Sequence, residues 1–270
     1  MVEESRTWHS SCGQVEVVVE ESSRGGYSMT GFRIWHAAEA LSEILCKQRR
    51  LVHGKEVLEL GAGCGLVSAV AASLGGRVTA TDRSQILPRL QRTASLGSPS
   101  QLFTAAELDW NTGCPTLEKR GFDIILGSDV TYGGDCHQAL LKLLWQFMQS
   151  SPAICLLAHC VRSLEQTALL WHKLRKDWPG TAWVYESYNV LVSCHDLKPE
   201  ESEALPSEVV YFVLSIVPPS EGSELFESYA AFLNASRERP LHSFEPPCEV
   251  FEEGMIGPQL PMDAEAIAAN

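Results

Sequence analysis

The sequence predicts an α/β protein, with a doubly wound, mostly parallel sheet of seven strands and an N-terminal hairpin extension. Short apolar runs of strand length alternate along the chain with segments of helical spacing, as expected for such a sheet. A glycine-rich turn follows the first apolar run and leads directly into a helix-forming segment. The last two runs have no helix between them, so we expect them to form a hairpin that brings an antiparallel strand into the sheet.

The expected elements cover most of the chain in order. An N-terminal hairpin would pair residues 15–20 with an extended segment that leads to Thr30 and Gly31, because serines and glycines at 22–26 favour a turn. Sheet strands are expected at 57–60, 77–81, 102–108, 122–127, 153–158, 182–185 and 209–217. Helices are expected from about 32, at 67–74, from Ser84, at about 136–148 and at 165–176. Pro88 is compatible with the helix after Ser84 only near its first turn.

The glycine turn has the spacing G-x-G-x-G, with Gly61, Gly63 and Gly65 directly after the first sheet strand. Such a turn lets a ligand approach the backbone closely and meet the partly positive N-terminus of the following helix. A dinucleotide-binding fingerprint would require glycine where Leu66 stands, which argues against NAD or FAD.

Several polar and aromatic residues fall where ligands bind in such sheets, beyond the carboxyl ends of the strands. Asp82 ends the second sheet strand, about 20 residues after the first glycine, where a carboxylate can accept hydrogen bonds from both hydroxyls of a ribose. Trp110 and Asp129 follow the third and fourth strands. Trp35 opens the helix before the sheet, so its side chain belongs either to the core or to the wall of a ligand pocket.

The composition fits one full-sized core, since the chain has 270 residues and is 45% hydrophobic. We expect residues 1–217 to form this domain and residues 218–270 to form an acidic tail that is partly helical or disordered. No apolar run is long enough to span a bilayer, and the N-terminus lacks the pattern of a signal peptide. The net charge of -13 argues against binding to nucleic acid phosphates and suits a basic protein substrate or a small molecule.

The nine cysteines are scattered, and no C-x-x-C motif occurs. We therefore expect reduced thiols in a cytoplasmic protein, or one that is also nuclear, and no metal site. Cys194-His195-Asp196 and His159-Cys160 lack a second cluster at ligand spacing, so we interpret them as strand-end and core residues. A monomer is expected.

Several stretches together resemble methyltransferase family 16, the protein-lysine methyltransferase-like group of the seven-stranded methyltransferases that use S-adenosylmethionine (SAM). These stretches are 30–38, the glycine turn with 64–67, 81–83, 108–110 and 126–132. The resemblance covers roughly residues 14–217, and the D-x-x-Y that follows the fourth strand, Asp129 to Tyr132, is its most specific part. One departure is that family members often carry asparagines where this chain has Thr93 and Ser95.

The resemblance implies a Rossmann-like SAM site and assigns roles to individual residues. Trp35 would border the methionine end of SAM, Asp82 would bind its ribose, Trp110 would flank the adenine, and Ser128 would lie near the sulfonium. The acid-x-G-x-G-x-G motif would hold the methionine moiety, and from this motif we include Glu59, Gly61, Ala62 and Gly63 among the cofactor-binding residues. Asp129 and Tyr132 would act on the acceptor side as the catalytic residues.

The implied reaction is transfer of a methyl group from SAM to a protein side-chain nitrogen, of lysine or, as a lesser possibility, histidine. Adenine amino-methyltransferases instead carry two prolines after the acid or amide, where this chain has Val130 and Thr131, so nucleic acid is a minor alternative. Two other interpretations stay open: a small-molecule methyltransferase, and a non-catalytic scaffold that binds SAM and holds a partner through its acidic tail.

Overall fold

The structure is a computed structural model, and it describes residues 3–20, 31–96, 102–131, 137–151, 153–160, 170, 181–187 and 209–215. Tyr132, most of the helix expected at 165–176 and the acidic tail lie outside the described residues.

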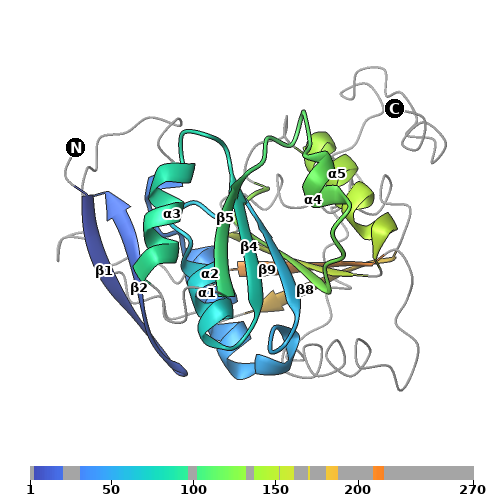
Figure 1. Cartoon of the computed structure of the whole chain (residues 1–270). Coiled ribbons are helices and arrows are strands. Elements are labelled where there is room, and N and C mark those ends of the chain that lie inside the picture. Colours follow the sequence, from blue (N-terminus) through green and yellow to red (C-terminus); the bar gives the residue numbers. More distant parts are fainter. Residues whose placement is uncertain are drawn as a thin grey trace, which may run out of the picture.

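The main sheet of the described chain has seven strands in the order β5-β4-β3-β6-β7-β9-β8 (Figure 1). They are β3 (Glu56–Leu60), β4 (Arg77–Asp82), β5 (Phe103–Glu107), β6 (Ile124–Ser128), β7 (Ile154–Cys160), β8 (Thr181–Ser187) and β9 (Val209–Ser215). The first five of these are parallel, whereas β9 is antiparallel to both β7 and β8. The expected doubly wound, mostly parallel sheet with a final antiparallel pair is therefore confirmed.

Helices cover both faces of this sheet (Figure 1). They are α1 (His36–Lys47), α2 (Leu66–Ser73), α3 (Leu87–Leu96), α4 (Pro115–Glu118) and α5 (His137–Ser150), with a short 3-10 helix at Arg49–Leu51. In Figure 1, α1, α2 and α3 lie on one side of the sheet, and α4 and α5 lie on the other. Pro88 is the second residue of α3, which is the position near the first turn that a proline requires.

The strands alternate their side chains between two cores, as the period of two residues along a strand requires. In β6, Ile124 and Leu126 pack in the cluster that contains α1, α2 and α3, whereas Ile125 packs in the cluster that contains α5. The same alternation holds for Val57 and Leu58 in β3. Because both faces are covered, the strands read as nearly continuous apolar runs in the sequence.

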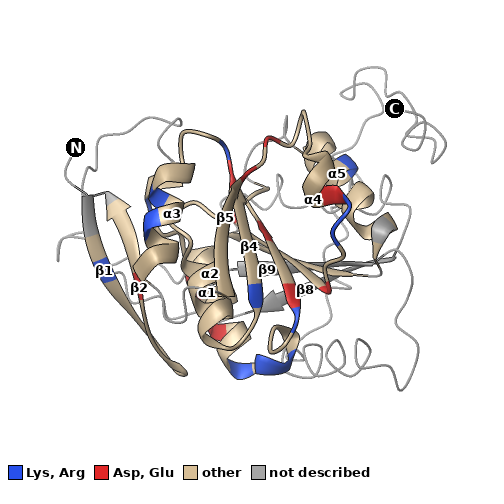
Figure 2. Ribbon diagram, in the orientation of Figure 1, with Lys and Arg blue, Asp and Glu red and all other residues tan. Residues whose placement is uncertain are grey.

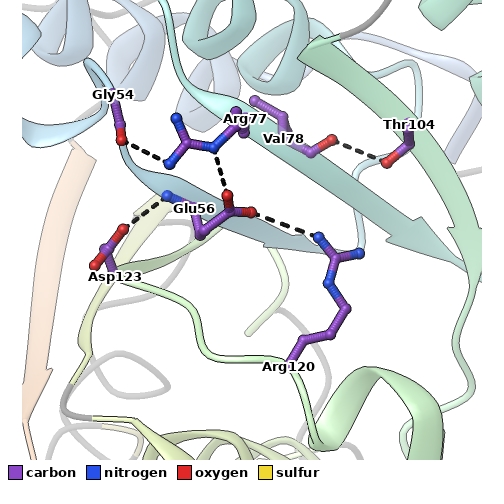
Figure 3. A network of polar contacts seen from close by, with 7 residues as sticks. All are labelled: Gly54, Glu56, Arg77, Val78, Thr104, Arg120 and Asp123. Atoms are coloured by element: carbon purple, nitrogen blue, oxygen red, sulfur yellow. Dashed lines mark hydrogen bonds and ion pairs between the residues drawn. The ribbon is translucent and has the colours of Figure 1, made fainter.

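Polar contacts fix the amino ends of the central strands (Figure 3). Glu56, the first residue of β3, accepts a hydrogen bond from Arg77 Nε at the start of β4 and pairs with Arg120 at 3.5 Å. The backbone N–H of Glu56 donates to Asp123 Oδ2 at 2.7 Å, and Arg77 Nη2 donates to the carbonyl of Gly54 at 2.9 Å. These contacts set the register of the strands at the edge opposite to the one where a ligand is expected.

The structure contains an N-terminal hairpin, but the partner strand precedes residues 15–20 in the sequence, and the predicted partner lies mostly outside the described residues. β2 (Gly13–Glu20) pairs with the preceding strand β1 (Glu3–Ser10), from Ser10 opposite Gly13 to Glu3 opposite Glu20. The segment that the sequence suggested as the partner falls mostly within residues 21–30, outside the described residues. β1 is polar and lacks an apolar alternation, so its sequence gave no strand signal, and it pairs along a strand whose Val17 and Val19 are buried.

The expectation of reduced thiols is wrong for one pair of cysteines. Cys12, in the turn of the hairpin, forms a disulfide with Cys46 near the end of α1, with Cα atoms 5.3 Å apart. The hairpin folds back over α1 and so brings together two residues that are 34 positions apart in sequence. Among the described cysteines, four are outside disulfides: Cys64, Cys114, Cys155 and Cys160.

None of the described helices has both the length and the apolar character needed to cross a membrane.

Candidate active site

A cavity of about 270 Å³ lies beyond the carboxyl ends of β3, β4 and β6. β3 has β4 on one side and β6 on the other, so the connections leave it in opposite directions and open a crevice between them. Eight residues that the sequence assigned to the site line this cavity: Trp35, Gly61, Ala62, Gly63, Asp82, Trp110, Ser128 and Asp129. The structure thus brings most of the predicted site into one place, while the individual roles of these residues stay predictions.

The glycine turn forms the floor of the cavity, and its backbone conformation requires glycine. Gly61, Gly63 and Gly65 have φ angles of 63°, 55° and 81°, in the left-handed region that other residues rarely adopt. A Cβ on Gly61 would lie 2.7 Å from Cγ1 of Val130, and a Cβ on Gly65 would lie 2.7 Å from Cδ1 of Leu90. The backbone of the turn therefore packs directly against neighbouring side chains, and at Gly61 and Gly63 it also faces the cavity without a side chain.

Asp82 lies at the end of β4 with its carboxylate held by the backbone. Its Oδ2 accepts a hydrogen bond from the N–H of Gly63 at 2.8 Å, and its Oδ1 accepts one from the N–H of Arg83 at 2.8 Å. Burial raises the pKa of Asp82 above its usual value, and these two hydrogen bonds oppose the rise because they favour the charged form. Each carboxylate oxygen has two lone pairs, so Asp82 can still accept hydrogen bonds from a ligand.

The walls of the cavity are largely apolar and aromatic. Trp35 caps the start of α1, and Trp110 follows β5 and lies close to Gly61, where an added Cβ would come within 3.4 Å of its ring. Ile86 packs against Gly31 so tightly that a Cβ on the glycine would lie 2.7 Å from Cδ1 of Ile86. Aromatic walls, a glycine floor and the strand-end carboxylate of Asp82 form a fitting pocket for a nucleoside with free ribose hydroxyls.

Asp129 lies on the opposite side of the glycine turn from Asp82, directly after β6. Its φ is 56°, and no other non-glycine residue that the structure describes has a positive φ. It is 5% exposed, and its backbone N–H donates to the carbonyl of Ala158 in β7 at 2.7 Å. A buried acid in a conformation that costs about 1–3 kcal/mol is a typical feature of a functional loop.

Val130 fixes this loop against the floor of the cavity. Its two methyl groups occupy the spaces that side chains on Gly61 and Gly127 would fill, at 2.7 Å and 3.0 Å from the positions of their Cβ atoms. The turn after β3 and the loop after β6 are therefore packed directly against each other, and Ser128 and Asp129 are held beside the glycines.

Glu59 does not line the cavity, so its assignment as a direct cofactor contact is not supported. Its side chain is fully buried beneath the turn and accepts a hydrogen bond from Ser68 Oγ in α2. Its Oε1 atom has no hydrogen-bond partner among the described residues, and burial raises the pKa of Glu59 to about 8. The acid of the motif thus joins β3 to α2 from inside the core.

Thr93, at the position where the family often has asparagine, links the glycine turn to the N-terminal hairpin. Its hydroxyl donates to the carbonyl of Cys64 at 2.9 Å and accepts a hydrogen bond from the N–H of Val18 at 3.0 Å. The threonine is fully buried. The departure in sequence therefore preserves a polar link to the turn.

Sequence reasoning missed several lining residues, including Gly31, Ile86, Asp109 and Asn111. Asp109 precedes Trp110 and accepts hydrogen bonds from the backbone N–H and the side-chain amide of Asn111, at 2.9 Å and 3.1 Å. Its place directly after the third strand was a signal that could have identified it, since the same rule selected Asp82. Gly31 belongs to the family stretch at 30–38 but was given no role there, and it meets Ile86 only through the fold.

The comparisons with known proteins agree with this geometry. A family model described as lysine methyltransferase matches residues 14–174. Protein N-lysine methyltransferase METTL21A of Danio rerio is 36% identical over 132 residues, which cover 48% of this chain and 60% of the relative. Histone-arginine methyltransferase METTL23 of Rattus norvegicus is 31% identical over 128 residues, which cover 46% of this chain and 56% of the relative. The matched part of the chain thus spans somewhat more than half the length of these relatives.

The fold is also found among solved structures. The structure of a SAM-dependent methyltransferase from Agrobacterium tumefaciens matches with a TM-score of 0.52 and 13% sequence identity, and the match covers 80% of this chain and 71% of that one. At this identity the likeness shows the Rossmann-like methyltransferase fold, which is the fold class that the sequence predicted.

Proposed function

Because the chain belongs to the lysine methyltransferase family, we propose that it transfers the methyl group of SAM to a lysine side chain of a protein. The observation that carries the proposal is that one cavity is lined both by the glycine turn with Asp82 and by Ser128 to Val130 of the Asp129 loop. One side suits a nucleoside cofactor, and the other offers a buried acid to an acceptor.

The cofactor supplies an activated methyl group on a sulfonium. The protein itself binds the methyl donor and the acceptor and aligns them. This is sufficient because an in-line displacement needs no covalent enzyme intermediate and depends mainly on orientation in a dry site. Asp82 binds the ribose hydroxyls, Trp110 flanks the adenine, and Gly61, Ala62 and Gly63 offer close backbone contact. Trp35 borders the methionine end. Substitutions on this side of the cavity are expected to abolish binding of both the methyl donor, SAM, and its product, S-adenosylhomocysteine.

The acceptor side has to receive a lysine that is neutral at the moment of transfer. A free lysine has a pKa of about 10.4, and removal from water next to a positive sulfonium lowers it. Asp129 orients the amine and accepts its departing proton. The negative charge of the same carboxylate attracts a protonated lysine into the cavity. Tyr132, which follows in the same D-x-x-Y stretch, completes the wall of the acceptor channel in this proposal.

A protein substrate suits the charge of the chain better than a nucleic acid. The net charge is -13, and in the view of Figure 2 the Lys and Arg residues of the described chain are spread over several elements, with Asp and Glu between them. Binding to phosphates would favour a gathered basic surface. We also propose that the protein works as a monomer, to be checked by analytical ultracentrifugation.

A cytoplasmic location, shared with the nucleus, is a further part of the proposal. It is supported by the buried thiols of Cys64 and Cys155, which are outside disulfides, whereas the Cys12–Cys46 disulfide does not support it. Fractionation of cells that express a tagged chain tests the location.

The function is tested with the purified protein, methyl-labelled SAM and a protein extract from cells that lack this chain, in which the acceptor is unmethylated. Mass spectrometry of the labelled proteins is expected to find methyl-lysine. Label in methyl-arginine would indicate the activity that the name of the METTL23 relative states, and label in methyl-histidine would change the acceptor residue. Label in small molecules alone would favour a small-molecule methyltransferase. SAM binding without any transfer would favour a non-catalytic scaffold.

A further inference from the structure

A buried histidine of the neighbouring strand β7 contacts the loop formed by Asp129, Val130 and Thr131. Nδ1 of His159, in β7, lies 2.8 Å from Oγ1 of Thr131, the second residue after Asp129. Thr131 is 4% exposed and His159 is 6% exposed, so water does not compete for this hydrogen bond. A second histidine, His137 at the start of α5, lies with Nε2 2.9 Å from the carbonyl oxygen of Thr131.

The chemistry of these contacts makes Thr131 an anchor point. A carbonyl oxygen can only accept, so His137 donates through its Nε2–H. The hydroxyl of Thr131 is meanwhile engaged with His159, so the side chain and the backbone of one residue are bound to two different elements. Hydrogen bonds of buried groups are costly to break, because a partner left behind has no water to replace the lost contact.

Three consecutive residues of the loop are each fixed by a different neighbour. Asp129 donates its backbone N–H to Ala158, the residue before His159; Val130 fills the space between Gly61 and Gly127; Thr131 is bound to His159. Asp129 keeps a left-handed φ of 56° between these attachments. Such a conformation persists only where the surroundings over-determine it.

We propose that His159 is a positioning residue of the methyl-transfer reaction, which acts through Thr131 to hold the Asp129 carboxylate at the acceptor side of the cavity. This inference rests on the proposed function. His159 is not among the residues that line the cavity, so it acts through the loop. Its contribution is to keep the loop from relaxing out of the strained conformation that directs Asp129.

The first part of the test compares two substitutions at His159. His159→Leu removes the hydrogen bond, whereas His159→Asn keeps an amide atom near the position of Nδ1. The readouts are a SAM titration by calorimetry and the single-turnover rate with methyl-labelled SAM and the protein extract described above. We expect His159→Leu to lower the rate by about 10- to 100-fold, the scale of misplacing a reacting group, with SAM affinity unchanged. His159→Asn should recover most of the rate.

The second part asks whether His159 acts through Asp129. If it does, His159→Leu should have little further effect on the rate in an Asp129→Asn background, because the group that it positions is already lost. Thr131→Val should likewise give the same loss as His159→Leu, and the two together should give no more than either alone. Cys155→Ala serves as the matched control, because this buried residue of β7 pairs with Ile125 in the middle of β6, three residues before the Ala158 that binds the loop; its rate should match that of the wild type.

The outcomes separate this inference from the proposed function. A wild-type protein that binds SAM but transfers no methyl group overturns both. An active wild type with an equally active His159→Leu variant overturns only the role of His159. A His159→Leu loss that multiplies with that of Asp129→Asn, or that Cys155→Ala reproduces, assigns His159 to stability alone and overturns its positioning role.

Discussion

Asp82 ties the end of β4 to the glycine turn, because its Oδ2 accepts a hydrogen bond from the backbone N–H of Gly63 at 2.8 Å. The carboxylate that is expected to bind the ribose therefore also holds the turn that is expected to hold the methionine moiety. Loss of this side chain should affect both parts of the cofactor site at once.

Asp82→Ala should weaken SAM binding by on the order of 2–3 kcal/mol, since the hydrogen bonds that are lost involve a charged acceptor. This corresponds to a loss of affinity of about 30- to 150-fold, to be measured by calorimetry with SAM and S-adenosylhomocysteine. Glu107→Ala is a matched control, because Glu107 is an exposed acid opposite Asp82 in the adjacent strand. NADH should not compete with SAM; competition would indicate a dehydrogenase-type site.

Gly61→Ala should abolish SAM binding and destabilise the fold, because the new Cβ would lie 2.7 Å from Val130. Gly54→Ala provides the matched control, since Gly54 has a similar φ of 72° but open space around the position of its Cβ. Both variants carry the cost of a left-handed alanine, about 1–2 kcal/mol, and only Gly61→Ala adds the clash. Thermal unfolding and SAM titration of both would separate the two effects. Equal behaviour of the two variants would mean that the packing against Val130 is unimportant. Gly63→Arg, which fills the turn, should also abolish binding.

Much of the site could be predicted because its residues sit at strand ends. Asp82, Trp110 and Asp129 lie far apart in sequence, but each follows a parallel strand, and parallel strands bring their carboxyl ends to one edge of the sheet. The final antiparallel pair was predictable for a similar reason, since a crossover between parallel strands requires a long connection, usually a helix.

What could not be predicted depends on contacts between distant residues. The polar strand β1 has no apolar alternation, so only its pairing with β2 makes it a strand. The left-handed backbone of Asp129 follows from its attachment to Ala158 and from the position of Val130. The sequence assigned Glu59 to the cavity because its motif also contains the cavity-lining glycines. The direction of its side chain is instead decided by its hydrogen bond with Ser68 in α2.

The burial of Glu59 should make stability depend on pH. The pKa of Glu59 is raised from 4.5 to about 8, mainly by burial, so between these values the folded protein keeps a proton that the unfolded chain has released. The free energy of unfolding therefore falls as the pH rises through this window. Glu59→Gln cannot titrate, so its melting temperature relative to the wild type should rise between pH 5 and pH 8. We expect a gain of at least about 2–4 °C, the effect of about 1 kcal/mol in a domain of this size.

Ser68→Ala is the control for this pH effect. The Ser68 hydroxyl favours the charged form of Glu59, so its removal raises the pKa further and the loss of stability should continue to higher pH. A difference between Glu59→Gln and the wild type that stays constant over the whole pH range would show that Glu59 remains charged when the protein is folded.

Deletion of the chain after Pro218 should leave SAM binding intact. The last described strand, β9, ends at Ser215, and the cavity is lined by residues between Gly31 and Val130. Circular dichroism and a SAM titration of the shortened protein would test this. Loss of folding would mean that residues of the tail belong to the core.

Asp129 is the residue on which the assignment of the acceptor side depends, and its backbone decides how it should be tested. Alanine is a poor replacement, because it would combine the loss of the carboxylate with a left-handed φ of 56° that alanine disfavours. Asparagine tolerates this conformation and keeps the shape of the side chain, so Asp129→Asn removes only the charge. Asp129→Gly removes the side chain and at the same time relieves the backbone strain.

If Asp129 aligns the acceptor amine and takes its proton, both variants should methylate about 100-fold more slowly or worse, because the interaction is made in the transition state. SAM affinity should change little, since Asp82 and the glycine turn lie on the other side of the cavity. Single-turnover methylation and SAM titration on the same preparations would measure the two effects. A wild-type rate for Asp129→Asn together with a reduced rate for Asp129→Gly would make Asp129 a determinant of loop shape, because asparagine preserves the backbone and the volume but not the charge. A parallel fall of affinity and rate in both variants would assign Asp129 to the cofactor pocket, and the group that receives the proton from lysine would then have to be sought elsewhere along the cavity.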